Sequence, residues 1–174
     1  MNIPNLLTII RFIIIPIFGY FLYFESYTVA VLLFLLGGLT DVLDGYIARR
    51  FNKVTSWGKL ADPAADKLMQ ITALVVLTVN KRIPFPILII VAAKEIFMGI
   101  GSIFLLKKEH HVVSSSWWGK MATVIFYLAV VAIIIFRMNE PASGIVAGVG
   151  ILPTIFAFIM YVKTFSSIRK EARQ

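Results

Sequence analysis

Residues 41–66 read DVLDGYIARRFNKVTSWGKLADPAAD, and they contain every aspartate of this 174-residue chain: Asp41, Asp44, Asp62 and Asp66. The chain as a whole is 59% hydrophobic and only 15% charged. An ionised side chain inside an apolar membrane segment costs about 2.5–3.5 kcal/mol on insertion scales. We therefore expect the four carboxylates to lie together and to be compensated by something cationic.

The sequence around this stretch predicts an all-α integral membrane protein, because the mean hydropathy is +0.88 and apolar runs recur along the whole chain. A transmembrane helix needs about 20 mainly apolar residues. The first run carries Arg11 and ends without a small-residue cleavage site, so we interpret it as a helix rather than a secretory signal. We expect one domain, residues 1–174, built as a bundle of six transmembrane helices over 6–24, 27–48, 60–79, 84–106, 117–136 and 144–162.

The distribution of basic residues predicts how the bundle is oriented. With six spans and the N-terminus inside, the outer loops hold only Lys81, Arg82 and Arg137 of the 17 lysines and arginines. We therefore expect a multi-pass protein of the cell membrane, with both termini and the aspartate cluster on the cytoplasmic side. The net charge of +8 then reflects topology and attraction to anionic lipid, and we expect no nucleic-acid partner.

The spacing of the aspartates predicts a helical hairpin with all four carboxylates at its open end. Asp41 and Asp44 are three residues apart, and Asp62 and Asp66 are four apart, so each pair shares one helix face. The chain between the pairs is short enough for an antiparallel turn. Single aspartates near helix ends are commonly solvated, but the joint spacing and depth of these four favour a functional cluster.

Carboxylates without cysteine or histidine among the candidate ligands favour a hard cation. The chain has no cysteine. We expect two divalent ions, Mg²⁺ or Mn²⁺, which commonly share their coordination with substrate phosphates. Gly45, Ala48 and Gly58 leave space beside the cluster, and Arg49 can pair with a phosphate, although Arg49 could equally be a topology signal.

The motif Asp41-x2-Asp44-Gly45-x2-Ala48-Arg49-x8-Gly58-x3-Asp62-x3-Asp66 resembles the complete signature of the CDP-alcohol phosphotransferase family. The length of the chain and its opening, MNIPNLLTIIR, are similar to those of bacterial phosphatidylglycerophosphate synthases. The resemblance implies that an acceptor hydroxyl attacks the phosphorus of CDP-diacylglycerol next to the lipid, with loss of CMP. It also implies a homodimer.

Carried over to this sequence, the resemblance assigns roles to residues. Asp41, Asp44, Asp62 and Asp66 would be the metal ligands, and Asp66 would also be the catalytic general base. The CDP-binding residues would be Asn5, Thr8, Asp41, Asp44, Gly45, Ala48, Arg49 and Gly58.

The acceptor alcohol is less well defined by the sequence. The stretches AAKEIF at 92–97 and WWGKMATV at 117–124 differ from the pattern of phosphatidylglycerophosphate synthases: Lys94 replaces an arginine, and Ala122 replaces a lysine. The second change resembles CMP-forming cardiolipin synthases, whose acceptor is phosphatidylglycerol. We favour glycerol 3-phosphate, bound by Lys59, Lys94 and Lys120, and keep phosphatidylglycerol as the alternative.

A divalent-cation transporter is the alternative from another functional class. It would need acidic residues deeper in the bundle and on further helices. Outside the aspartate motif, Glu95 is the only acidic residue placed within a predicted span. The sequence therefore favours an enzyme.

Overall fold

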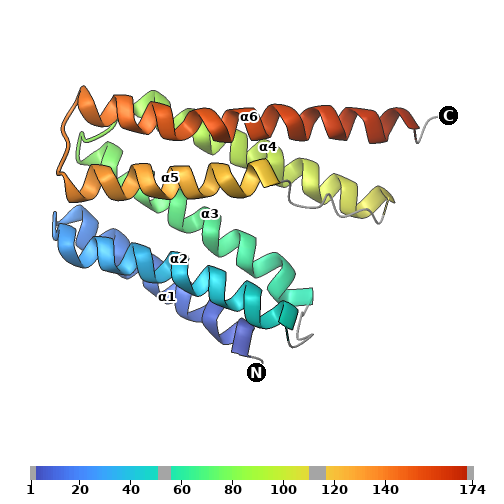
Figure 1. The fold of residues 1–174 in the computed structure, drawn as a ribbon, viewed down its shortest axis with the longest axis horizontal. Coiled ribbons are helices and arrows are strands. Elements are labelled where there is room, and N and C mark those ends of the chain that lie inside the picture. Colours follow the sequence, from blue (N-terminus) through green and yellow to red (C-terminus); the bar gives the residue numbers. More distant parts are fainter. Residues whose placement is uncertain (1–2, 51–55, 110–116, 172–174) are drawn as a thin grey trace.

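The computed structural model describes residues 3–50, 56–109 and 117–171, and these residues form six helices without a strand (Figure 1). Some side chains within these ranges are not described, including those of Asp44, Gly45, Ala48, Arg49, Lys59 and Lys120. The helices are α1 (Ile3–Tyr23), α2 (Tyr27–Arg50), α3 (Ser56–Val79), α4 (Phe85–Glu109), α5 (Trp117–Ile135) and α6 (Ala142–Glu171).

Successive helices alternate in direction, so both chain ends lie away from the turns after α1, α3 and α5, which gather at the left of Figure 1. α1 packs against α2 and α3, and α5 packs against α6. α4 contacts α3 and α6, while α2 provides the contact to α5. The aspartate-bearing halves of α2 and α3 therefore lie beside the first half of α1.

The first five helices begin and end within four residues of the predicted positions. The predicted last span, 144–162, agrees with the apolar span Ala142–Met160, but the helix itself is longer and α6 continues to Glu171. The prediction followed the apolar run, but backbone hydrogen bonding continues through the polar residues, where neither glycine nor proline interrupts the helix.

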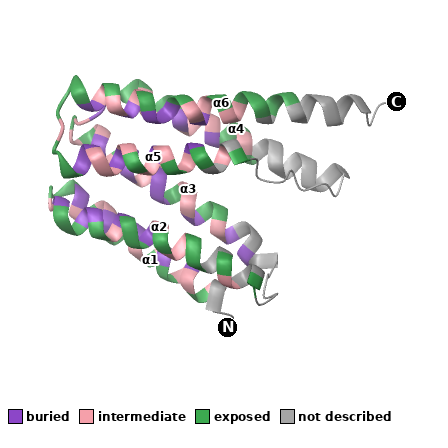
Figure 2. Ribbon diagram, in the orientation of Figure 1, coloured by how far each residue is buried: buried purple, intermediate pink, exposed green. Residues whose placement is uncertain are grey.

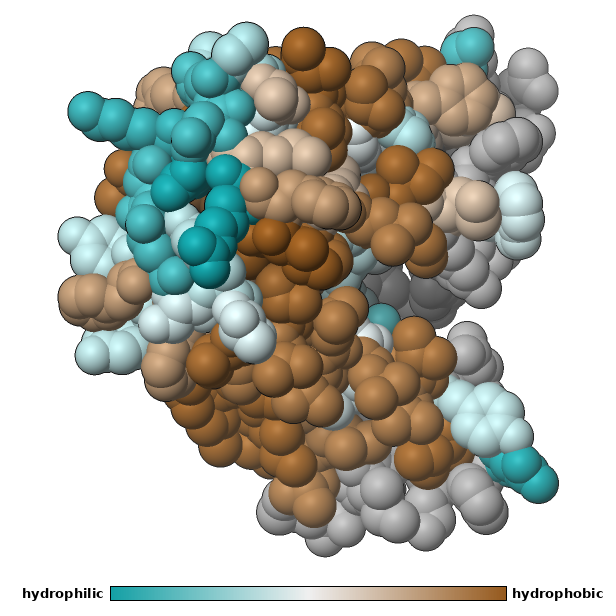
Figure 3. Space-filling view, turned by 60° about the vertical axis from the view of Figure 1, so that its left-hand side comes forward, coloured by the Kyte–Doolittle hydropathy of each residue, from teal (hydrophilic) through white to brown (hydrophobic). Residues whose placement is uncertain are grey.

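Apolar side chains fill the interior and also cover the outside of the bundle. Phe18 and Phe34 are fully buried, and their ring centroids lie 5.2 Å apart between α1 and α2. Large apolar side chains are exposed on all six helices, such as Leu128 at 63% (Figures 2 and 3). Large apolar side chains exposed on every helix fit a lipid environment. Asn5–Tyr23 and Ala142–Met160 are each long and apolar enough to cross a membrane. Six spans remain a prediction.

α1, α3 and α5 end in the same way, although none of them ends in glycine. Glu25, Lys81 and Arg137 follow these helices with φ of 57°, 54° and 48°. Each left-handed residue lets the next amide reach back to a helical carbonyl, as when Ser26 N–H donates to Phe21 O at 2.9 Å. This cap supplies partners for carbonyls that the helix end leaves unpaired.

Arg82 joins the three turns at this end of the bundle. Its guanidinium donates to Glu25 Oε1 at 2.8 Å and to the Tyr27 hydroxyl at 2.7 Å, and it also donates to the side chain of Asn139. The hydrogen bond from Arg82 lowers the pKa of the Glu25 carboxyl below its usual value. These contacts fix the turn end, away from the aspartates.

A glycine on α6 sets the distance between α5 and α6. A methyl group at Gly150 would lie 2.6 Å from Cβ of Ala129, well inside van der Waals contact, whereas one at Gly148 would meet no atom within 4 Å. The two glycines therefore differ in packing although they lie on the same helix.

We expect Gly150→Ala to lower the free energy of unfolding by about 1–3 kcal/mol, because the added methyl forces α5 and α6 apart. Gly148→Ala is the matched control and should be neutral or slightly stabilising, since alanine favours a helix more than glycine does. Thermal unfolding in detergent, followed by circular dichroism, measures both variants. Equal stability of the two would contradict this packing.

Candidate active site

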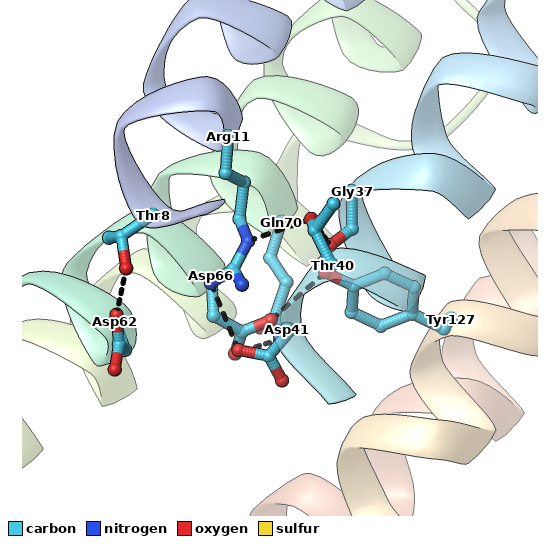
Figure 4. Close-up of polar contacts among 9 residues, drawn as sticks. All are labelled: Thr8, Arg11, Gly37, Thr40, Asp41, Asp62, Asp66, Gln70 and Tyr127. Carbon is cyan, nitrogen blue, oxygen red and sulfur yellow. Dashed lines mark hydrogen bonds and ion pairs between the residues drawn. The ribbon is translucent and has the colours of Figure 1, made fainter. Parts of the chain in front are cut away.

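A buried arginine on α1 holds the first aspartate of the motif. Arg11 is 0% exposed, and its Nη1 lies 2.9 Å from Oδ1 of Asp41 on α2 (Figure 4). Its Nε donates to the Thr40 hydroxyl at 3.4 Å, and that hydroxyl donates to the Gly37 carbonyl at 2.7 Å. A guanidinium in this apolar setting is stable only beside a carboxylate, so Arg11 and Asp41 fix each other.

A second residue of α1 holds the third aspartate. The buried Thr8 hydroxyl donates to Oδ1 of Asp62 on α3. Asn5, Thr8 and Arg11 are spaced by three residues and share one face of α1. That face therefore binds both helices of the predicted hairpin, α2 through Asp41 and α3 through Asp62.

Both oxygens of Asp66 accept hydrogen bonds from uncharged side chains. The Tyr127 hydroxyl on α5 donates to Oδ1 at 2.9 Å, and Nε2 of Gln70 donates to Oδ2 at 3.1 Å (Figure 4). Neither donor was predicted from the sequence. Gln70 stands four residues after Asp66 on the same helix face, which is a usable signal, whereas Tyr127 follows Asp66 by 61 residues and has no such signal.

The structure brings Asp41, Asp62 and Asp66, three of the four predicted metal ligands, to one region of the bundle. Figure 4 shows the carboxylates of Asp41 and Asp66 close to each other, with Asp62 beside Thr8 at one side. No three acidic or histidine side chains among those described are close enough to hold an ion. The donor chemistry fits Mg²⁺ or Mn²⁺, since every ligand would be a carboxylate oxygen.

Several of the predicted site residues fall outside the described side chains. Gly58 is buried in the first turn of α3, and Asn5 and Thr8 lie on the face of α1 described above. The side chains outside the described set are those of Asp44, Gly45, Ala48, Arg49, Lys59 and Lys120.

Lys94 lies in a charged cluster between α3 and α4. The buried Glu95 carboxylate has Lys67 Nζ 2.7 Å from Oε2 and Lys94 Nζ 2.6 Å from Oε1. The contact with Lys94 is an ion pair without hydrogen-bond geometry. Lys67 directly follows Asp66, so this cluster adjoins the aspartate site, and its two ammonium groups outweigh its one carboxylate.

The sequence of the chain matches a known protein family. The family model described as CDP-alcohol phosphatidyltransferase matches residues 1–166. The chain belongs to the CDP-alcohol phosphatidyltransferase family. The family resemblance read from residues 41–66 is thereby confirmed.

Some relatives of this chain are named CDP-diacylglycerol–glycerol-3-phosphate 3-phosphatidyltransferases, and others are named cardiolipin synthases. A CDP-diacylglycerol–glycerol-3-phosphate 3-phosphatidyltransferase of Aquifex aeolicus is 38% identical over 62% of this chain and 61% of its own length. One of Pseudomonas fluorescens is 50% identical over 44% of this chain and 41% of its own. A human cardiolipin synthase (CMP-forming) is 35% identical over 61% of this chain and 35% of its own. The matches thus span less than two thirds of each relative.

The Arg11–Asp41 pair predicts a measurable coupling in a double-mutant cycle. Arg11→Met and Asp41→Asn should each destabilise the protein, and the double variant should lose less than the sum, with a coupling of about 1 kcal/mol or more. Unfolding in mixed detergent micelles measures all four proteins.

The more exposed Arg82–Glu25 pair, at 2.8 Å, is the matched comparison. Its coupling in an Arg82→Met and Glu25→Gln cycle should be below about 1 kcal/mol, because water screens it. A coupling of zero between Arg11 and Asp41 would show that the pair does not hold α1 to α2.

Proposed function

We propose that this protein is a membrane-embedded CDP-diacylglycerol-dependent phosphatidyltransferase of phospholipid synthesis. The observation that carries the proposal is the placement of Asp41, Asp62 and Asp66 at one end of α1–α3, each held by a side chain of another residue in a chain that belongs to this family. Relatives named as phosphatidyltransferases support the same reaction class.

The reaction is a displacement at phosphorus. The acceptor hydroxyl oxygen bonds to the phosphorus next to the lipid, the bond from that phosphorus to CMP breaks, and CMP leaves with the electron pair. The acceptor proton passes to the carboxylate of Asp66. Each Asp66 oxygen has two lone pairs and uses one on Tyr127 or Gln70, so an acceptor hydroxyl can still donate to it.

We propose that Asp41, Asp44, Asp62 and Asp66 hold two divalent ions, Mg²⁺ or Mn²⁺. Such ions would supply positive charge to the pyrophosphate of the donor and to the departing CMP. Arg11 and Thr8 hold two of these ligands at the face of α1. Asn5, Thr8, Gly45, Ala48, Arg49 and Gly58 remain the predicted lining for CDP.

Glycerol 3-phosphate is the acceptor that we propose, giving phosphatidylglycerophosphate and CMP. The Lys67–Glu95–Lys94 cluster carries a net positive charge beside Asp66, which favours an acceptor with a phosphate monoester. Lys59, Lys94 and Lys120 remain the predicted acceptor residues. The human relative named cardiolipin synthase supports the alternative, in which phosphatidylglycerol is the acceptor.

We further propose six membrane spans in a single domain, with both termini and the aspartate site facing the cytoplasm. The alternating helices and the exposed apolar side chains on every helix support this arrangement. Arg82 and Arg137 would then lie on the opposite side of the membrane. The homodimer implied by the family also remains part of the proposal.

We expect the purified protein to release CMP from CDP-diacylglycerol in the presence of Mg²⁺ or Mn²⁺ and glycerol 3-phosphate, and to lose this activity with EDTA. Separate reactions with glycerol 3-phosphate and with phosphatidylglycerol, analysed for CMP and for the lipid product, identify the acceptor. Asp66→Asn should abolish turnover. Glu140→Gln is the control, because Glu140 lies in the exposed turn between α5 and α6, at the opposite end of the bundle from the aspartates, and this variant should leave turnover unchanged.

Failure to release CMP with either acceptor would contradict the reaction class. A lipid product formed only from phosphatidylglycerol would replace the proposed acceptor with the alternative. Wild-type turnover by Asp66→Asn would remove Asp66 as the base.

A further inference from the structure

We propose that Tyr127 and Gln70 are positioning residues that orient the carboxylate of Asp66 for the reaction. This inference rests on the proposed function, because it assigns Asp66 its place in the same site. Neither residue belongs to the aspartate motif, and they reach Asp66 from different helices, Tyr127 from α5 and Gln70 from α3.

The two hydrogen bonds together define the plane of the carboxylate. Oδ1 accepts from the Tyr127 hydroxyl at 2.9 Å, and Oδ2 accepts from Gln70 Nε2 at 3.1 Å (Figure 4). A single donor would leave the group free to rotate about its Cβ–Cγ bond. Two donors on different oxygens direct the remaining lone pairs, which must face the acceptor hydroxyl or an ion.

The ring of Tyr127 is seated on α2, so its hydroxyl has little freedom of its own. The ring stacks on the fully buried Phe34, with centroids 4.5 Å apart and an interplanar angle of 25°. Its edge lies over Gly38, where a methyl group would be 3.3 Å from Cε1. Packing against α2 therefore fixes the position of the Tyr127 hydroxyl. This hydroxyl belongs to α5 and donates to Asp66 on α3.

The donors to Asp66 are uncharged, unlike the partner of Asp41. Arg11 brings a full positive charge to Asp41 at 2.9 Å, whereas the hydroxyl and the amide bring only dipoles to Asp66. Gln70 is only 4% exposed, so the amide is not shared freely with water. These two donors therefore hold Asp66 in place through dipoles alone and add no charge of their own to the carboxylate.

Tyr127→Phe removes the hydroxyl and keeps the stacked ring. In nanodiscs with CDP-diacylglycerol and glycerol 3-phosphate, we expect kcat to fall about 10- to 100-fold, as is typical when a partner of a catalytic or ligating carboxylate is lost. KM for either substrate should change by less than about 3-fold, because the substrate contacts remain. Gln70→Met should act in the same direction.

Tyr20→Phe is the matched control, since Tyr20 is an exposed residue of α1 whose ring also contacts phenylalanines. It should leave kcat unchanged. Mn²⁺ binding, measured by electron paramagnetic resonance, provides a second readout that does not need turnover. Tyr127→Phe should weaken Mn²⁺ binding about 10-fold in the otherwise wild-type protein and should have no effect in the Asp66→Asn background, because Tyr127 acts through Asp66.

The outcomes separate this inference from the proposed function. If the wild-type protein turns over and Tyr127→Phe keeps kcat within about 2-fold of it, the positioning role is wrong. An equal effect of Tyr127→Phe on Mn²⁺ binding with and without Asp66 would also overturn the role, since it would reveal general structural damage. If the wild-type protein releases no CMP, the proposed function fails, and the Mn²⁺ comparison alone decides how Asp66 is held.

Discussion

A fully buried guanidinium on α1 needs a carboxylate beside it, and the position of the whole aspartate motif depends on this requirement. Arg11 meets it with Asp41 on α2, and Thr8, one turn earlier, binds Asp62 on α3. α1 is therefore the element that holds the two motif helices in register. Moving α1 would separate a buried charge from its partner, at a cost of several kcal/mol, so the arrangement resists displacement.

The two ends of the bundle use polar groups for different purposes. At the turn end, left-handed caps and the contacts of Arg82 satisfy the backbone and tie three turns together. At the other end, each oxygen of the Asp66 carboxylate accepts one hydrogen bond and has a second lone pair that these two donors do not use. Oriented carboxylates of this kind would position the groups that the proposed displacement at phosphorus brings together.

Periodicity and spacing predicted the parts of the structure that local sequence determines. Apolar runs predicted the positions of the helices, and the intervals of three and four residues predicted which helix faces carry the aspartates. The apolar run predicted the span of α6 but not the polar turns through which this helix continues to Glu171. The caps at Glu25, Lys81 and Arg137 lack the glycine that normally marks them. The donor Tyr127 could not be predicted, because its contact with Asp66 depends on how α5 packs against α2.

We propose that the aspartates of α2 and α3 form the ion site of a phosphatidyltransferase. Crystals grown with Mn²⁺ and CDP-diacylglycerol, measured at a wavelength where manganese scatters anomalously, test it most directly. We predict anomalous density within about 2.5 Å of carboxylate oxygens of Asp41, Asp62 and Asp66, next to the donor pyrophosphate. Donor density with manganese bound elsewhere, and none at these carboxylates, would contradict the claim.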